Sequence, residues 1–202
     1  MKLLNATLGA LLIGLVSMPV FAHDDDHKKK GNNECPVGLV SGMSLDDEFG
    51  PGSQELTRCI KKRHDVKMVV QIFQLCANGA ATCTSPYALG NISNILDDYE
   101  ITHGMKAGRD YEVVAVLHGS GGRMALKGNP FESQVKGLMA RGVKFYFCQN
   151  TTRGFIRAGI LPNYQATGNS ATDQLIEGMQ YTTAGLTSIA DFQALGYQYI
   201  QP

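Results

Sequence analysis

Residues 143–155 read Val-Lys-Phe-Tyr-Phe-Cys-Gln-Asn-Thr-Thr-Arg-Gly-Phe, and this stretch decides the fold class. Its apolar side chains at every second position from 143 to 147 are typical of a strand with one buried face. The polar residues 150–152 that follow are good candidates to cap a short helix, which we expect to continue through Ile160. The stretch therefore predicts a strand that passes into a helix.

The same alternation of strand and helix extends over the region from residue 66 to residue 202. We expect strands at 67–73, 111–117, 143–147, about 179–183 and 197–200, and helices at about 91–103, 130–141, 150–160, 171–177 and 187–195. This order predicts an α/β fold: a single-domain, open, mostly parallel five-stranded sheet with helices on both faces.

The N-terminal segments have different compositions. Residues 1–22 combine Lys2, a short apolar run and a small-residue ending, which together predict a secretory signal peptide and an exported chain that does not stay in the membrane. Residues 23–34 are almost entirely polar, and we expect a disordered tail. Residues 35–65 form an N-terminal extension with a helix expected near Ser53, ahead of the α/β domain at 66–202.

The formal net charge of the 202 residues is zero, so the chain offers no strongly basic surface for nucleic acid. The cysteines show no zinc, haem-attachment or thioredoxin-type spacing, and we expect no metal and no cofactor. His23 and His27, which flank three aspartates, could hold a divalent metal loosely, although such blocks are more often solvated.

The chain contains five cysteines, so an exported protein can pair four of them and leave one over. Cys76 and Cys83 bracket a short loop, and Cys35 and Cys59 lie together before the first strand of the domain. These pairings leave Cys148 free. The alternative is a disulfide between Cys148 and either Cys76 or Cys83.

Cys148 stands where the apolar strand stops and the helix begins. The unpaired N–H groups and the positive dipole end of a helix favour a thiolate over a thiol, and Arg153 adds positive charge close in sequence. A thiolate is the nucleophilic form of cysteine. The alternative is that Cys148 is a small buried hydrophobic residue without a chemical role.

Ligands of open α/β sheets bind at the carboxyl ends of the strands, where His118, Gly119 and Cys148 are expected to lie. His118 could act as a base or as a hydrogen-bond donor, although a histidine at a strand end is more often structural. Gly119 begins a glycine-rich loop that could hold an anion but lacks the ending of a nucleotide-binding loop. Asn150 and Thr151 are further candidates for substrate binding.

The pattern formed by Cys148, Thr151, Arg153, Gly154 and Gly159 resembles the cysteine motif of the DsrE/DsrF family of sulfur-relay proteins. Members of that family carry sulfane sulfur as a persulfide on a cysteine. The strand and helix pattern of the family also resembles this chain at residues 67–73, 111–119 and 186–202, so the resemblance covers roughly residues 66–202.

The resemblance implies a sulfur carrier or sulfurtransferase-like protein that uses Cys148, with sulfur donors and acceptor thiols as partners. It also implies a homo-oligomer, a trimer or hexamer, and favours a bacterial protein, for which export means the periplasm. Well-studied relays of the family are cytoplasmic, so two alternatives stay open: a redox-responsive thiol protein and a non-catalytic module that binds a small ligand. A carrier predicts an accessible Cys148, and a binding module predicts a buried one.

Overall fold

The structure is a computed structural model that describes residues 43–57 and 63–202. The expected signal peptide, the polar tail, Cys35 and Cys59 lie outside the described residues. Residues 43–57 form two short helices, α1 (Leu45–Phe49) and α2 (Ser53–Leu56), and α2 is the helix expected near Ser53.

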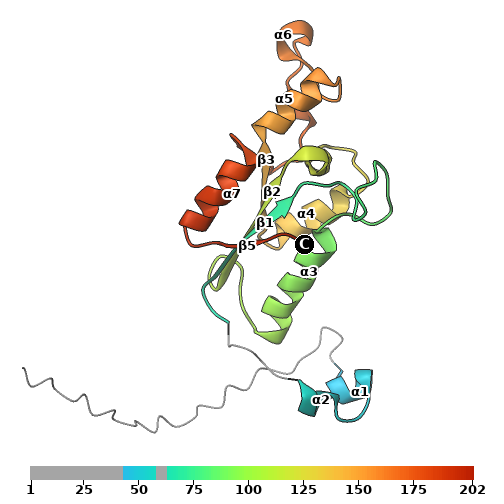
Figure 1. Ribbon diagram of the computed structural model, residues 1–202, viewed down its shortest axis with the longest axis vertical. Coiled ribbons are helices and arrows are strands. Elements are labelled where there is room, and N and C mark those ends of the chain that lie inside the picture. The colour runs from blue at the N-terminus through green and yellow to red at the C-terminus, as the bar shows by residue number, and fades with distance from the viewer. Residues whose placement is uncertain (1–42, 58–62) are drawn as a thin grey trace, which may run out of the picture. The chain divides into compact units, whose positions relative to one another are not determined.

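The centre of the domain is a five-stranded sheet in the order β4-β3-β2-β1-β5 (Figure 1). Every neighbouring pair is parallel, which confirms the open α/β sheet expected from the sequence. The strands are β1 (Val66–Ile72), β2 (Tyr111–Leu117), β3 (Lys144–Cys148), β4 (Gln180–Thr182) and β5 (Gln198–Ile200).

Helices and helical turns connect the strands. The α-helices of the domain are α3 (Leu89–Asp97), α4 (Glu132–Ala140), α5 (Gln149–Arg157), α6 (Tyr164–Thr167) and α7 (Gly185–Ala194). A π-helical turn, η1 (Asp98–Thr102), extends α3, and 3₁₀ turns form η2 (Gly119–Ala125) and η3 (Ala171–Gln174). Among these described residues, no helix is long and apolar enough to cross a membrane.

The two faces of the sheet are covered by different helices, as Figure 1 shows. On one face, Phe145 and Phe147 of β3 and alternate residues of β1 and β2 pack against α3 and α4 in the main core. On the other face, Val69, Val114 and Val116 pack against Ile189 of α7 and Tyr197. The alternation in each strand therefore separates two apolar layers, as the pleat of a β-sheet requires.

The step from β3 to α5 differs from the sequence prediction. The expected cap at residues 150–152 is wrong, because α5 already begins at Gln149 and the N-cap is Cys148 itself. The helix ends at Arg157 rather than Ile160. Because strand and helix are joined without a loop, Cys148 is fixed by both elements.

Cys76 and Cys83 form a disulfide, which confirms the local pairing expected for these two residues. Cys148 is free, so the alternative pairing of Cys148 with either of them is wrong.

Candidate functional site

Cys148 lies at the carboxyl edge of the sheet, at the junction of β3 and α5. Its backbone carbonyl accepts a hydrogen bond of 3.1 Å from the hydroxyl of Thr152, one turn into the helix. Only 4% of its surface is exposed. The side chain is therefore held in place, and it is far less accessible than the sequence analysis expected for a sulfur carrier.

The sulfur of Cys148 has a backbone hydrogen-bond donor. The N–H of Gly185, the first residue of α7, points at Sγ over an N-to-S distance of 3.1 Å. The helix α5 also starts at the residue after Cys148. The sulfur therefore receives one backbone donor, from α7, and makes no capping hydrogen bond to α5, although the dipole of a helix N-terminus favours negative charge nearby.

His118, directly after β2, also contacts Gly185. A methyl group built on Gly185 would be 3.1 Å from Cβ of His118 and 3.2 Å from two ring carbons, so the imidazole packs directly on the glycine backbone. The sequence-predicted residues His118 and Cys148 therefore both contact the first residue of α7.

A chain of hydrogen bonds fixes the orientation of His118. The side-chain amide Nε2 of Gln71, on β1, lies 2.7 Å from Nε2 of His118, and the amide oxygen of Gln71 accepts a hydrogen bond from the hydroxyl of Tyr199. Since the amide N–H donates, the ring Nε2 accepts, and the proton of the neutral imidazole lies on Nδ1. Burial lowers the pKa of His118, which favours this neutral form.

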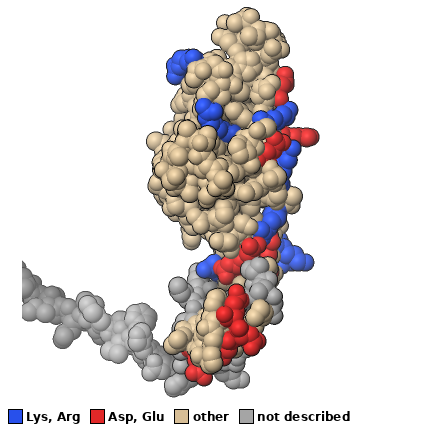
Figure 2. All heavy atoms as spheres, turned by 90° about the vertical axis from the view of Figure 1, so that its right-hand side faces the viewer, with Lys and Arg blue, Asp and Glu red and all other residues tan. Residues whose placement is uncertain are grey.

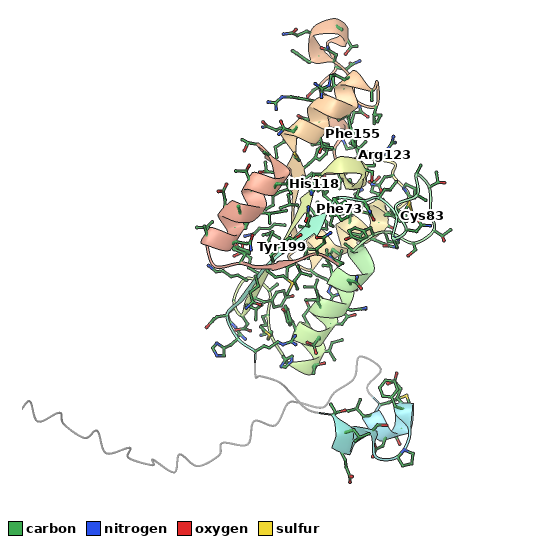
Figure 3. All side chains as sticks on the ribbon, viewed as in Figure 1. Phe73, Cys83, His118, Arg123, Phe155 and Tyr199 are labelled. Carbon is green, nitrogen blue, oxygen red and sulfur yellow. A yellow bond between two sulfur atoms is a disulfide. The ribbon has the colours of Figure 1, made fainter. Side chains whose placement is uncertain are left out.

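The ring of His118 also stacks on Phe73, with 6.3 Å between the ring centroids. Figure 3 shows His118 and Phe73 close together, with Tyr199 farther along on β5. The environment of the imidazole is thus one aromatic ring, one amide and one backbone segment. This arrangement suits a neutral hydrogen-bond donor better than a cation.

Other predicted site residues lie apart from the sulfur. Arg153 is exposed, and its guanidinium donates to the side-chain oxygen of Asn150 at 2.6 Å, within α5. Thr151 accepts a hydrogen bond of 3.1 Å from the N–H of Gly119, which ties α5 to the residue after His118. In the described structure, Thr151 and Gly119 therefore hold the two strand ends together, while Arg153 and Asn150 bind one another.

Sequence reasoning did not assign Gln71, Tyr199 or Gly185 to the site. Gln71 carries a weak signal, because it is an uncharged polar residue within the otherwise apolar run 68–72, and the structure buries it to 9% exposure. Gly185 carries no signal of its own in the sequence. Its role needs the packing of α7 over β2 and β3, which no local pattern specifies.

Within residues 43–57 and 63–202, no group of three or more potential metal ligands comes together. In the described part of the domain, Cys148 is absent from the lining of three surface cavities, one of which is described below. The geometry at Cys148 is that of a single sulfur with one backbone donor, Gly185, which also contacts the imidazole of His118.

No protein-family model matches the chain. No curated protein matches it. Among the solved structures that match is a protein of unknown function from Methanobacterium thermoautotrophicum, 22% identical, with a TM-score of 0.48; the match covers 68% of this chain and 100% of that one. A likeness this distant carries no argument about function, and the resemblance to the DsrE/DsrF family remains a prediction.

Proposed function

We propose that this protein carries sulfane sulfur as a persulfide on Cys148. One observation carries the proposal: the N–H of Gly185 points at Sγ of Cys148 from 3.1 Å, at the start of α7, while α5 starts at the following residue. Both the thiolate that attacks a sulfur donor and the persulfide anion that results are negatively charged at sulfur. Backbone N–H groups at helix N-termini stabilise such charge without a cofactor.

The proposed chemistry is thiol–persulfide exchange without net oxidation. The Cys148 thiolate attacks a sulfur atom of a polysulfide, a new S–S bond forms, the S–S bond within the donor breaks, and the shortened polysulfide leaves with the electron pair. An acceptor thiolate then attacks the outer sulfur of the Cys148 persulfide. Cys148 leaves as a thiolate, and the starting state returns.

His118 has a role in this proposal that follows from its tautomer. Because its Nε2 accepts from Gln71, the ring presents Nδ1–H, which can donate a hydrogen bond to an anionic outer sulfur. We assign His118 this donor role rather than that of a base.

We further propose export to an oxidising compartment, the periplasm if the organism is bacterial, and assembly into a homo-oligomer. The disulfide between Cys76 and Cys83 supports the first proposal, because disulfides persist outside the reducing cytoplasm. The second rests on the family resemblance alone.

A second candidate function is a ligand-binding module in which Cys148 has no chemical role. The 4% exposure of Cys148 favours this candidate, because a free cysteine packed between strand and helix is often a small apolar residue. In the carrier, a donor reaches Sγ only when the first turn of α7 moves away from it.

Intact-mass spectrometry tests the two candidates in one experiment. The folded wild type and a Cys148→Ser variant are incubated with polysulfide and, separately, with thiosulfate. The carrier gains the mass of one or more sulfur atoms and the variant gains none. If wild type gains no sulfur and resists iodoacetamide until it is unfolded, Cys148 is inert and the binding module is the better account. A redox-responsive thiol would instead gain oxygen or glutathione on treatment with peroxide and glutathione.

A further inference from the structure

A cavity with a volume of about 350 Å³ lies beside the disulfide, next to the start of α4. This region is separate from Cys148, because α4 covers the face of the sheet opposite α7. Three segments line the cavity: the disulfide loop, the end of η2 with the residues after it, and the turn before α4. The lining residues are Leu75, Ala81, Thr82, Cys83, Arg123, Leu126, Lys127, Gly128, Asn129, Pro130 and Phe131.

The inner wall of the cavity is apolar. Leu75 and Phe131 are 6% and 3% exposed and belong to the main core. The outer wall is the loop closed by the disulfide, and backbone hydrogen bonds between its two ends, from Ala77 to Ser85 and from Tyr87 to Leu75, hold it in place. The cavity therefore exists before any ligand enters, and its volume is at the lower end of the range for small-molecule sites.

The loop contributes no charge, since residues 73–96 contain no acidic or basic side chain. Figure 2 views the domain from the side on which Figure 3 places Cys83 and Arg123, and much of this surface is uncharged. The charge of the cavity therefore comes from Arg123 and Lys127.

Both cations are exposed, and the pKa of Glu132 is lowered mainly by Lys136 and to a smaller extent by Lys127. The guanidinium of Arg123 lies over the ring of Phe155, 5.9 Å from its centroid, and the ammonium of Lys127 donates to the backbone carbonyl of Asp173 at 2.7 Å. Among the residues that the structure describes, no carboxylate forms an ion pair with either. The carboxylate of Glu132, at the start of α4, is already bound by Lys136 and by the N–H of Gly128.

We propose that this cavity binds a small organic acid. The carboxylate of the ligand pairs with Arg123, whose planar guanidinium matches two carboxylate oxygens, and Lys127 adds a second positive charge. The apolar body of the ligand packs on Leu75 and Phe131. An inorganic anion would leave this apolar wall exposed, and a neutral ligand would form no ion pair with either cation. The proposal is independent of Cys148.

Isothermal titration calorimetry with benzoate tests this site on the whole chain with its disulfide intact. Benzamide has the same shape without the charge, and acetate has the charge without the apolar body. We expect saturable binding of benzoate, at least about tenfold tighter than that of either control ligand, which is the scale of one charge-assisted hydrogen bond.

Three variants locate the binding. Arg123→Gln should weaken benzoate binding at least about tenfold. Arg157→Gln removes an exposed cation of α5 that does not line the cavity, and it should leave the affinity unchanged. Ala81→Trp fills the cavity from the loop without changing charge, and it should abolish binding while the circular dichroism spectrum stays that of wild type.

The proposal is overturned if wild type shows no saturable binding of benzoate. It is also overturned if benzamide binds as tightly as benzoate, or if Arg123→Gln and Arg157→Gln bind benzoate equally well. Each of these results removes either the site or its preference for an anion.

Discussion

Cys148 and His118 both contact the backbone of Gly185. Its N–H donates to Sγ of Cys148, and its α-carbon packs so closely on His118 that a methyl group there would be crowded. One residue of α7 thus determines how closely the helix approaches the ends of β2 and β3. The close approach of α7 therefore both buries Cys148 and supplies the N–H that donates to its sulfur.

Replacement of Gly185 by alanine should expose Cys148. The new methyl group would lie 3.1 Å from Cβ of His118, which rotation of the ring cannot relieve, and we expect the first turn of α7 to shift outward by a few tenths of an ångström. We expect the reaction of native Cys148 with iodoacetamide to become several-fold faster. Gly154→Ala is the matched control, because a methyl group at Gly154 meets nothing within 4 Å. Equal rates in Gly185→Ala and wild type would show that α7 does not limit access.

Gly121→Ala should destabilise the fold, whereas Gly154→Ala should stabilise it. A methyl group on Gly121 would lie 2.5 Å from the carbonyl oxygen of Ile72, which is backbone and cannot rotate away. We expect the free energy of unfolding to fall by about 2 kcal/mol, as for an overpacked core. In Gly154→Ala it should rise by roughly 0.5–1 kcal/mol, the difference between glycine and alanine inside a helix. Urea unfolding measures both changes. Similar free energies of unfolding for the two variants would contradict the close approach of Gly121, in η2, to Ile72, in β1.

The sequence predicted the sheet well because each strand of a parallel sheet carries its own apolar pattern. All five expected strands are present, and β2 has the predicted bounds, since an apolar run such as 111–117 has no competing helical period. The start of α5 was wrong for a local reason. Residues 150–152 are better capping residues than cysteine, but the helix starts two residues too early for Asn150 to be its N-cap.

The candidate site was only half predictable. Cys148 and His118 could be found because each follows an apolar strand, and strand ends meet at one edge. The partners of His118 could not, because Gln71 and Tyr199 belong to β1 and β5, and only the strand order β2-β1-β5 brings them together. The burial of Cys148 also depends on α7, which begins 37 residues further along the chain.

Removal of the disulfide should lower stability without a change of fold. The double variant Cys76→Ser, Cys83→Ser loses the closure of a short loop, which predicts a loss of about 2 kcal/mol in the free energy of unfolding. The main core is otherwise unchanged. Urea unfolding of the variant and of oxidised wild type provides the comparison. An unchanged midpoint would mean that the other loop contacts suffice to hold the segment.

The stability of the protein should fall on acidification through His118. Burial lowers the pKa of this residue below the 6.5 of an exposed histidine. In the interval between the two values the unfolded chain binds more protons than the folded one, so the free energy of unfolding decreases as the pH falls. Wild type should therefore lose more stability than His118→Gln between pH values of about 7 and 5. Parallel stability curves for the two proteins would contradict a buried, neutral His118.

Gln71→Glu should reverse the protonation of His118. A carboxylate in place of the amide would face Nε2 of the ring over the present distance of 2.7 Å, and it can only accept a hydrogen bond. The imidazole would then hold a proton on Nε2 and favour the cation, so we expect its pKa to rise by about 1 unit or more. Histidine NMR titration measures this value directly. Gln201→Glu is the control, because residue 201 contacts the hydroxyl of Tyr199 and not the ring. A pKa that rises equally in both variants would mean a general effect of added charge rather than the contact between Gln71 and His118.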